Sequence, residues 1–300
     1  MTDDFLVRRA PHPLPTVHPV PEYRVDGQRR RLYDEMKAAL QVPWMGVVTM
    51  AYAHYPTFFA TLWEGIRPLV TGPSFLRHSH ELRAMVEQQV QALTPPPLRP
   101  SLQALGYAPR ELDQLQQTLE VFSHGNFPYL IIATLVRVLL AGADMEGVAA
   151  EERRSFDAAP TPLHSASLVL MEAHHADAPT RAIYEDVKHT LGLPFVNTDY
   201  RAMARWPSYF ALAWSGLKPV VTGQSHARIC DLVHGDVMDR VRRHLPNPAG
   251  LSARALRAAA QTDAPLEEVC RMAELFQWLL PGLVTNVAFF RAQLLEGAGA

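Results

Sequence analysis

The residue of this chain best suited to act as an acid or base is the aspartate at position 199. It lies in an internal repeat, in which residues 26–74 align with residues 177–225 at a constant offset of 151 and without a gap. Val48 stands opposite Asp199 in this repeat, so the fold has no symmetric need for a carboxylate there. Because valine at the equivalent position of the other repeat indicates a buried environment, Asp199 is predicted to be a semi-buried carboxylate. The alternative interpretation is structural, because acids near a helix start satisfy free N–H groups and the helix dipole.

The second candidate is the amide at position 126. Residues 123–126 read Ser-His-Gly-Asn and interrupt a hydrophobic run, whereas the corresponding residues 277–280 of the second half read Gln-Trp-Leu-Leu. The pattern therefore places the amide of Asn126 beside the core in one half only. The alternative is a turn or a helix break, since Gly and Asn both favour left-handed backbone conformations.

Metal-binding and phosphate-binding patterns are weak. His78 and His80 are two residues apart and His174 and His175 are adjacent, and neither spacing matches the i,i+4 ligand pair of helical zinc sites. The sequence contains no GxSxG, GxGxxG or phosphate-binding loop. These spacings favour solvated histidines over a metal site.

The elements that must position these residues are helices. In the first predicted helix, residues 26–40, apolar residues recur at four-residue spacing behind Asp26 as N-cap, and its twin begins at Asp177. Further helices are predicted over residues 79–93 and 227–245, and apolar helices over residues 129–140 and 283–295. Almost nothing alternates with period two, so the predicted fold is all-α.

The repeat also predicts how the chain is organised. We expect an extended N-terminal arm over residues 1–20, a helical repeat over 21–142, a linker over 143–176 and a second helical repeat over 177–300. Two halves of this length, each with apolar helices to cover, are predicted to pack as a pseudo-twofold fused dimer around one core. A cleft forms naturally at such an interface.

Composition limits the partners. With 48% hydrophobic and 19% charged residues the chain can bury a sizeable core, and its net charge of −2 gives no reason to expect nucleic acid. The longest apolar run, residues 130–140, is interrupted by Arg137 and is too short to span a bilayer, and the N-terminus lacks a signal-peptide pattern. Cys230 and Cys270 form no CxxC pair. We expect a cytoplasmic protein without membrane or nucleic-acid partners, and the sequence leaves a homodimer open.

Three segments carry a resemblance to a known family. They are residues 42–44 (Val-Pro-Trp), residues 122–129 (Phe-Ser-His-Gly-Asn-Phe-Pro-Tyr) and residues 198–207 (Thr-Asp-Tyr-Arg-Ala-Met-Ala-Arg-Trp-Pro). With the tandem repeat, they resemble the group I 2-haloacid dehalogenases, which act on both D- and L-2-haloacids and are unrelated to the aspartyl-ester haloacid dehalogenase superfamily. The likeness covers most of the chain.

This resemblance implies a fold and a site. The family fold is an all-α fused pseudo-dimer with one active site between the repeats. Its water-activating aspartate maps onto Asp199, its water-holding asparagine onto Asn126, and its pocket tryptophan onto Trp44. The chain departs from the family at Val47, where a bulkier aromatic is expected, and at residues 123–124 and 193–195. These changes alter the pocket and leave the base and amide in place, so substrate choice is the open point.

The implied reaction is direct displacement of halide at C2 by water, without a covalent ester and without a metal or organic cofactor. The product is the 2-hydroxy acid of inverted configuration, and both enantiomers of a small 2-haloalkanoic acid are expected to react. Free N–H groups at the helix starts near Pro43 and Thr198 are candidates for the substrate carboxylate. The indole N–H of Trp44 or Trp278 is a candidate for the leaving halide. A helix start lowers the pKa of Asp199, whereas burial against Trp44 and Val47 raises it.

Three other functions were compared with this one on the sequence alone. A related hydrolase or lyase could act on another small carboxylic acid with the same Asp199 and Asn126. A redox protein of the alkylhydroperoxidase type would need a CxxC pair, which the isolated cysteines do not supply. A non-catalytic helical binding protein would use Asp199 only to cap a helix.

Overall fold

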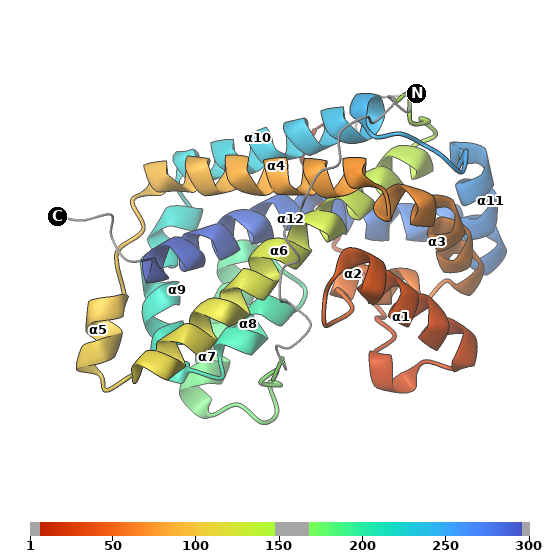
Figure 1. Cartoon of the computed structure of the whole chain (residues 1–300). Helices are drawn as coiled ribbons and strands as arrows, with labels where there is room; N and C mark the ends of the chain where they lie inside the picture. The colour runs from red at the N-terminus through yellow and green to blue at the C-terminus, as the bar shows by residue number, and fades with distance from the viewer. Residues whose placement is uncertain (1–6, 148–167, 296–300) are drawn as a thin grey trace.

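The computed structural model describes residues 7–147 and 168–295, and its regular structure over these residues is helical (Figure 1). The predicted all-α class is therefore confirmed for the described part of the chain. The expected linker over residues 143–176 lies in part outside the described residues.

The helices follow the same order in the two parts of the chain. The first part contains α1 (Gly27–Leu40), α2 (Val47–Tyr52), α3 (Pro56–Val70), α4 (Pro73–Val90), α5 (Arg99–Ala104) and α6 (Pro109–Leu140). The second part contains α7 (Ala178–Leu191), α8 (Thr198–Met203), α9 (Pro207–Val221), α10 (Gln224–Asp239), α11 (Ala253–Asp263) and α12 (Leu266–Leu294). Short 3-10 turns cover Glu22–Arg24 and Gln91–Leu93, and a π-helical turn covers Arg240–His244.

Helix starts follow the expected chemistry. Asp26 caps α1 by accepting a hydrogen bond from the Arg29 amide, and Asp177 caps α7 by accepting one from the Thr180 amide. Two starts were predicted too late, because α4 begins at Pro73 rather than at residue 79 and α10 begins at Gln224 rather than at residue 227. In α4 the proline occupies the first turn, where its missing N–H has no helical partner to lose.

The alternative of a turn or helix break at residues 123–126 is not what the structure shows. Gly125 and Asn126 lie inside α6, which runs without interruption from the amphipathic segment into the apolar one. The apolar helix expected over residues 283–295 is likewise the second part of the longer α12. Both helices are buried along the second half of their length, and this packing outweighs the weak helix propensity of a Gly-Asn pair.

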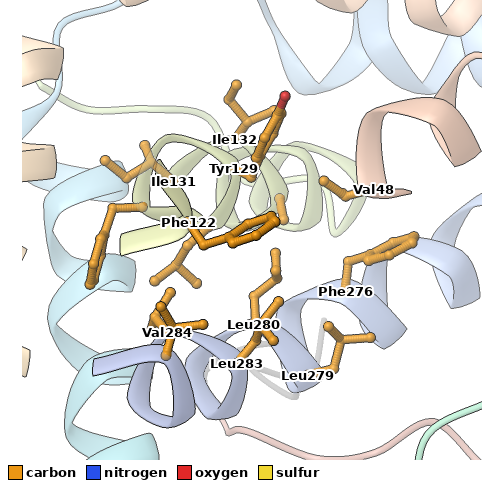
Figure 2. Packing of buried hydrophobic residues seen from close by; sticks show 14 of the residues in the cluster. Val48, Phe122, Tyr129, Ile131, Ile132, Phe276, Leu279, Leu280, Leu283 and Val284 are labelled. Carbon is orange, nitrogen blue, oxygen red and sulfur yellow. The ribbon is translucent and has the colours of Figure 1, made fainter. Parts of the chain in front are cut away.

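The core lies between α6 and α12, which pack along each other (Figure 2). Helices α4 and α10 lie side by side above this pair, α11 packs on α3 at one end, and α5 lies at the opposite end (Figure 1). Within the described residues, no helix combines the length and the apolar character that a membrane crossing requires.

Candidate active site

Asp199 and Asn126, the two candidates chosen because the repeats differ there, are in direct contact. Asp199 lies in the first turn of α8 and Asn126 lies in the middle of α6. The side-chain amide of Asn126 donates a hydrogen bond of 2.7 Å from Nδ2 to Oδ1 of Asp199. The two residues are only 3% and 4% exposed. The carboxylate therefore binds across to another helix, while the N-cap position of α8 is held by Asn197.

A small chamber surrounds this pair. Its volume is about 20 Å³, enough for about one water molecule. The chamber is mostly apolar, because Val48 of α2 and several side chains of α12 are among its walls. Figure 2 labels Val48 and four of these α12 residues, namely Phe276, Leu279, Leu280 and Leu283. It is lined by Trp44, Gly46, Val47, Val48, Asn126, Tyr129, Asn197, Thr198, Asp199, Phe276, Leu279, Leu280 and Leu283.

Burial makes Asp199 a stronger base than an exposed aspartate. Loss of hydration raises the pKa of Asp199 to about 6, although the Asn126 hydrogen bond and the charge of Arg201 act in the opposite direction. Of the two opposing effects expected from the sequence, burial therefore dominates. The carboxylate is ionised at neutral pH and binds a proton readily.

The indole of Trp44 is fixed by contacts with α6. Tyr129 donates a hydrogen bond of 2.8 Å from its hydroxyl to the Trp44 carbonyl, and the Phe122 ring packs edge-on against the indole at 5.0 Å between centroids. Gly125 permits the close approach, because a Cβ atom there would lie 2.4 Å from Cη2 of Trp44. A glycine in α6 thus seats the indole beside the chamber.

The structure brings together most of the residues predicted to bind substrate. Trp44, Val47 and Thr198 line the chamber with Asp199 and Asn126. The Thr198 hydroxyl also accepts a hydrogen bond of 3.3 Å from Arg201.

Trp278 instead lines a second space, which we call the adjoining cavity. It has a volume of about 150 Å³ and shares Asn197, Leu279 and Leu283 with the chamber. Its remaining lining residues are Arg8, Thr190, Leu191, Leu193, Tyr200, Val221, His226, Ala227, Gly282 and Asn286.

Sequence reasoning missed Arg8 and Asn197 as lining residues. Arg8 lies in an arm without periodicity, so no pattern connects it with α12. Among the described residues, no group of three or more His, Cys, Asp or Glu side chains is placed to hold a metal ion.

Comparison with known proteins assigns the family. A family model described as halocarboxylic acid dehydrogenase DehI matches residues 43–194. An (R)-2-haloacid dehalogenase of Rhizobium sp. (strain NHG3) is 46% identical over 248 residues, which cover 82% of this chain and 95% of that protein. The chain belongs to the DehI family. It is a hydrolase that acts on carbon–halide bonds.

Other members support the same assignment. An (R)-2-haloacid dehalogenase of Pseudomonas putida is 34% identical over 300 residues, which cover 99% of each chain. A solved structure described as a D-2-haloacid dehalogenase mutant in complex with D-2-CPA has a TM-score of 0.86 and 33% identity, and covers 96% of this chain and 100% of its own. The predicted likeness to haloacid dehalogenases is therefore confirmed at the level of the DehI family and its reaction class.

Proposed function

We propose that the chain hydrolyses small 2-haloalkanoic acids to 2-hydroxy acids by direct attack of a water molecule that Asp199 activates. The observation that carries this proposal is the buried Asp199 carboxylate, hydrogen-bonded to Asn126 in a chamber with room for about one water. A positioned base typically accelerates a reaction by about 10²–10⁴-fold.

The bonds change in one concerted step. The water oxygen forms a bond to C2 from the side opposite the halogen, while a water proton passes to Asp199. The carbon–halogen bond breaks and the halide leaves with the electron pair. C2 inverts its configuration, no bond to the enzyme forms, and Asp199 later returns its proton to solvent.

Asn126 is proposed to position the water rather than to react. Its Nδ2 is already bound to Asp199, which leaves the amide oxygen as an acceptor for the second water proton. A water that donates one proton to the carboxylate and the other to the amide oxygen keeps its lone pairs free to attack, and orientation of this kind lowers the barrier without a cofactor.

The enantiomer preference is the finer part of the proposal. The prediction that both enantiomers react stays a prediction, whereas the relatives at 46% and 34% identity are named for the (R) form. We therefore propose (R)-2-haloacids as the preferred substrates. Trp44 and Val47 are proposed to decide whether the (S) form also fits, with the indole N–H of Trp44 or Trp278 receiving the halide.

We also propose that the chain works as two related halves with one active site. Asp199 comes from the second half and Asn126 from the first, and their counterparts in the repeat have different chemistry. A single chain would then hold one reaction centre at the contact of α6 with α8.

The first test is halide release from (R)- and (S)-2-chloropropionate, measured separately for the wild type, Asp199→Asn and Asp177→Asn. Asp177 is a matched control, because it is an aspartate that truly caps a helix start in the same half. We expect Asp199→Asn to lose about 10²–10⁴-fold in kcat and Asp177→Asn to retain activity. Equal activity in all three proteins would exclude Asp199 as the base.

A second test distinguishes direct attack from a covalent ester. One turnover with enzyme in excess, run in ¹⁸O-labelled water, places ¹⁸O in the 2-hydroxy acid if water attacks C2. If an aspartyl ester forms, the first product carries unlabelled oxygen from the carboxylate, and label appears in the protein. Label in the protein would overturn the proposed mechanism.

A further inference from the structure

The adjoining cavity is large enough for a substrate, unlike the chamber. A cavity of about 150 Å³ holds a molecule of the size of benzene, so a three-carbon halo acid fits into this one. The two spaces share Asn197, Leu279 and Leu283 as walls, so the cavity is next to the chamber that Asp199 and Asn126 line.

The only cationic side chain among the described lining residues of this cavity is Arg8. It comes from the N-terminal arm, and its side chain is 19% exposed. Its Nε donates a hydrogen bond of 3.0 Å to the Trp278 carbonyl, and Nη1 lies 3.7 Å from Oδ1 of Asp231. A guanidinium has five N–H donors, so these contacts fix its position and leave donors for a ligand.

The other polar groups of the cavity are uncharged or satisfy one another. His226 Nε2 and Asn286 Oδ1 are 2.8 Å apart, and Asn286 Nδ2 donates to the Tyr200 hydroxyl at 3.0 Å. Burial lowers the pKa of His226, and the charge of Arg8 lowers it further, against the effect of Asn286. Among the described lining residues Arg8 therefore supplies the only charge, and the exposed Asp231 carboxylate 3.7 Å away offsets it only in part because water screens that pair, so the cavity suits an anion.

Asn197 provides a second sign of a ligand. Its side chain is buried on the wall common to both spaces, yet no group of the described residues donates a hydrogen bond to its Oδ1. A buried amide oxygen without a donor is unfavourable unless a water or another bound molecule donates a hydrogen bond to it.

We propose that Arg8 binds the substrate carboxylate in the adjoining cavity and so holds C2 of the 2-haloacid toward the Asp199 chamber. This inference rests on the proposed function. It assigns to the N-terminal arm the carboxylate recognition that the sequence placed at the helix starts near Pro43 and Thr198. Arg8 then makes the same contact in the bound substrate and in the transition state.

The test compares Arg8→Gln, Arg8→Lys and Arg9→Gln with (R)-2-chloropropionate as substrate. Arg9 is the matched control, because it is an exposed arginine on the same arm. A hydrogen bond to a charged group corresponds to about a 10–100-fold change in affinity. We expect Arg8→Gln to raise KM by about that factor with little change in kcat, as for loss of uniform binding. Arg8→Lys should restore part of the effect and Arg9→Gln should show none.

Two further measurements separate recognition of charge from a structural role. Arg8→Gln should not change kcat/KM for the neutral 2-chloropropionamide, and it should weaken competitive inhibition by propionate. If Arg8→Gln does not fold, Ala227→Trp decides, because Ala227 lines the cavity at an exposed position of α10 and a large side chain there blocks the space. We expect it to raise KM.

The outcomes separate the two proposals. A folded wild type that releases halide from neither enantiomer contradicts the proposed function. An active wild type whose KM is unchanged in a folded Arg8→Gln, or in Ala227→Trp, overturns the proposal that Arg8 binds the carboxylate in this cavity. An equal loss for the acid and the amide would also overturn it, because the arginine would then support the fold alone.

Discussion

At the scale of the residue, the buried Asp199 carboxylate makes the folded protein less stable. Each pKa unit corresponds to about 1.4 kcal/mol, and burial raises the pKa of Asp199 from its ordinary 3.8 to about 6. The folded state therefore binds the proton more tightly than the unfolded state does. Stability falls as pH rises from about 4 to about 6, and above this window the loss is complete. A carboxylate kept at such a position is consistent with a catalytic use.

Asp199→Asn is therefore predicted to stabilise the protein at pH 7, by up to about 3 kcal/mol, because the neutral amide avoids the buried charge. The gain should vanish near pH 4, where the wild-type carboxyl is protonated. In the wild type, kcat/KM should fall as pH drops below about 6, because protonated Asp199 cannot accept a proton. Urea unfolding at both pH values and a pH–rate profile provide the measurements.

The helix cap Asp177 is the control for this prediction. Its hydrogen bonds to Thr180 hold its pKa below the ordinary value, so its stability linkage has the opposite sign to that of Asp199. Asp177→Asn should show no gain at pH 7. If Asp199→Asn is instead no more stable than the wild type at pH 7, Asp199 is not a desolvated carboxylate.

At the scale of the element, the sequence indicated most of the helices and both members of the central pair. The repeat marked Asp199 and Asn126 because each differs from its counterpart, and such a difference can be seen without a structure. The continuity of α6 could not be predicted, because Gly125 and Asn126 are weak helix formers held in place by partners distant in sequence. Arg8 was missed for a related reason, since a single contact to α12 leaves no periodic pattern.

Gly125 of α6 also yields a prediction, because it allows α6 to pack closely against the loop that carries Val42 and Trp44. In Gly125→Ala the new Cβ would meet Trp44 Cη2 at 2.4 Å and Val42 Cγ1 at 2.8 Å. We expect a loss of about 1–3 kcal/mol in stability from overpacking, and a lower kcat/KM because the indole must move in the chamber wall. Gly235→Ala in α10 is the control, since its Cβ would meet nothing within 4 Å. It should gain about 0.5–1 kcal/mol. Unchanged kinetics in Gly125→Ala would show that the position of the indole does not matter.

At the scale of the whole molecule, hydrogen bonds join the two halves at both ends of the α6–α12 pair. At one end, Asp263 of α11 accepts a hydrogen bond of 2.8 Å from the Phe58 amide of α3. At the other, the Leu98 amide before α5 donates one of 2.8 Å to the Gln293 carbonyl of α12. Each half therefore satisfies backbone groups of the other, and α6 and α12 bury each other between these ends. We therefore expect the stability of each proposed repeat to depend on the presence of the other.

We therefore predict that neither residues 1–142 nor residues 177–300 fold alone. Each fragment would expose the buried face of α6 or α12, and an apolar surface of that kind favours aggregation over a folded monomer. Separate fragments should show no cooperative unfolding, whereas co-expression should restore a folded pair and halide release, because Asn126 and Asp199 lie on different fragments. Circular dichroism melts of each fragment and of the co-purified pair provide the measurement. A fragment that melts cooperatively by itself would show that the half is an independent domain, and the site would then lie between two domains rather than within one core.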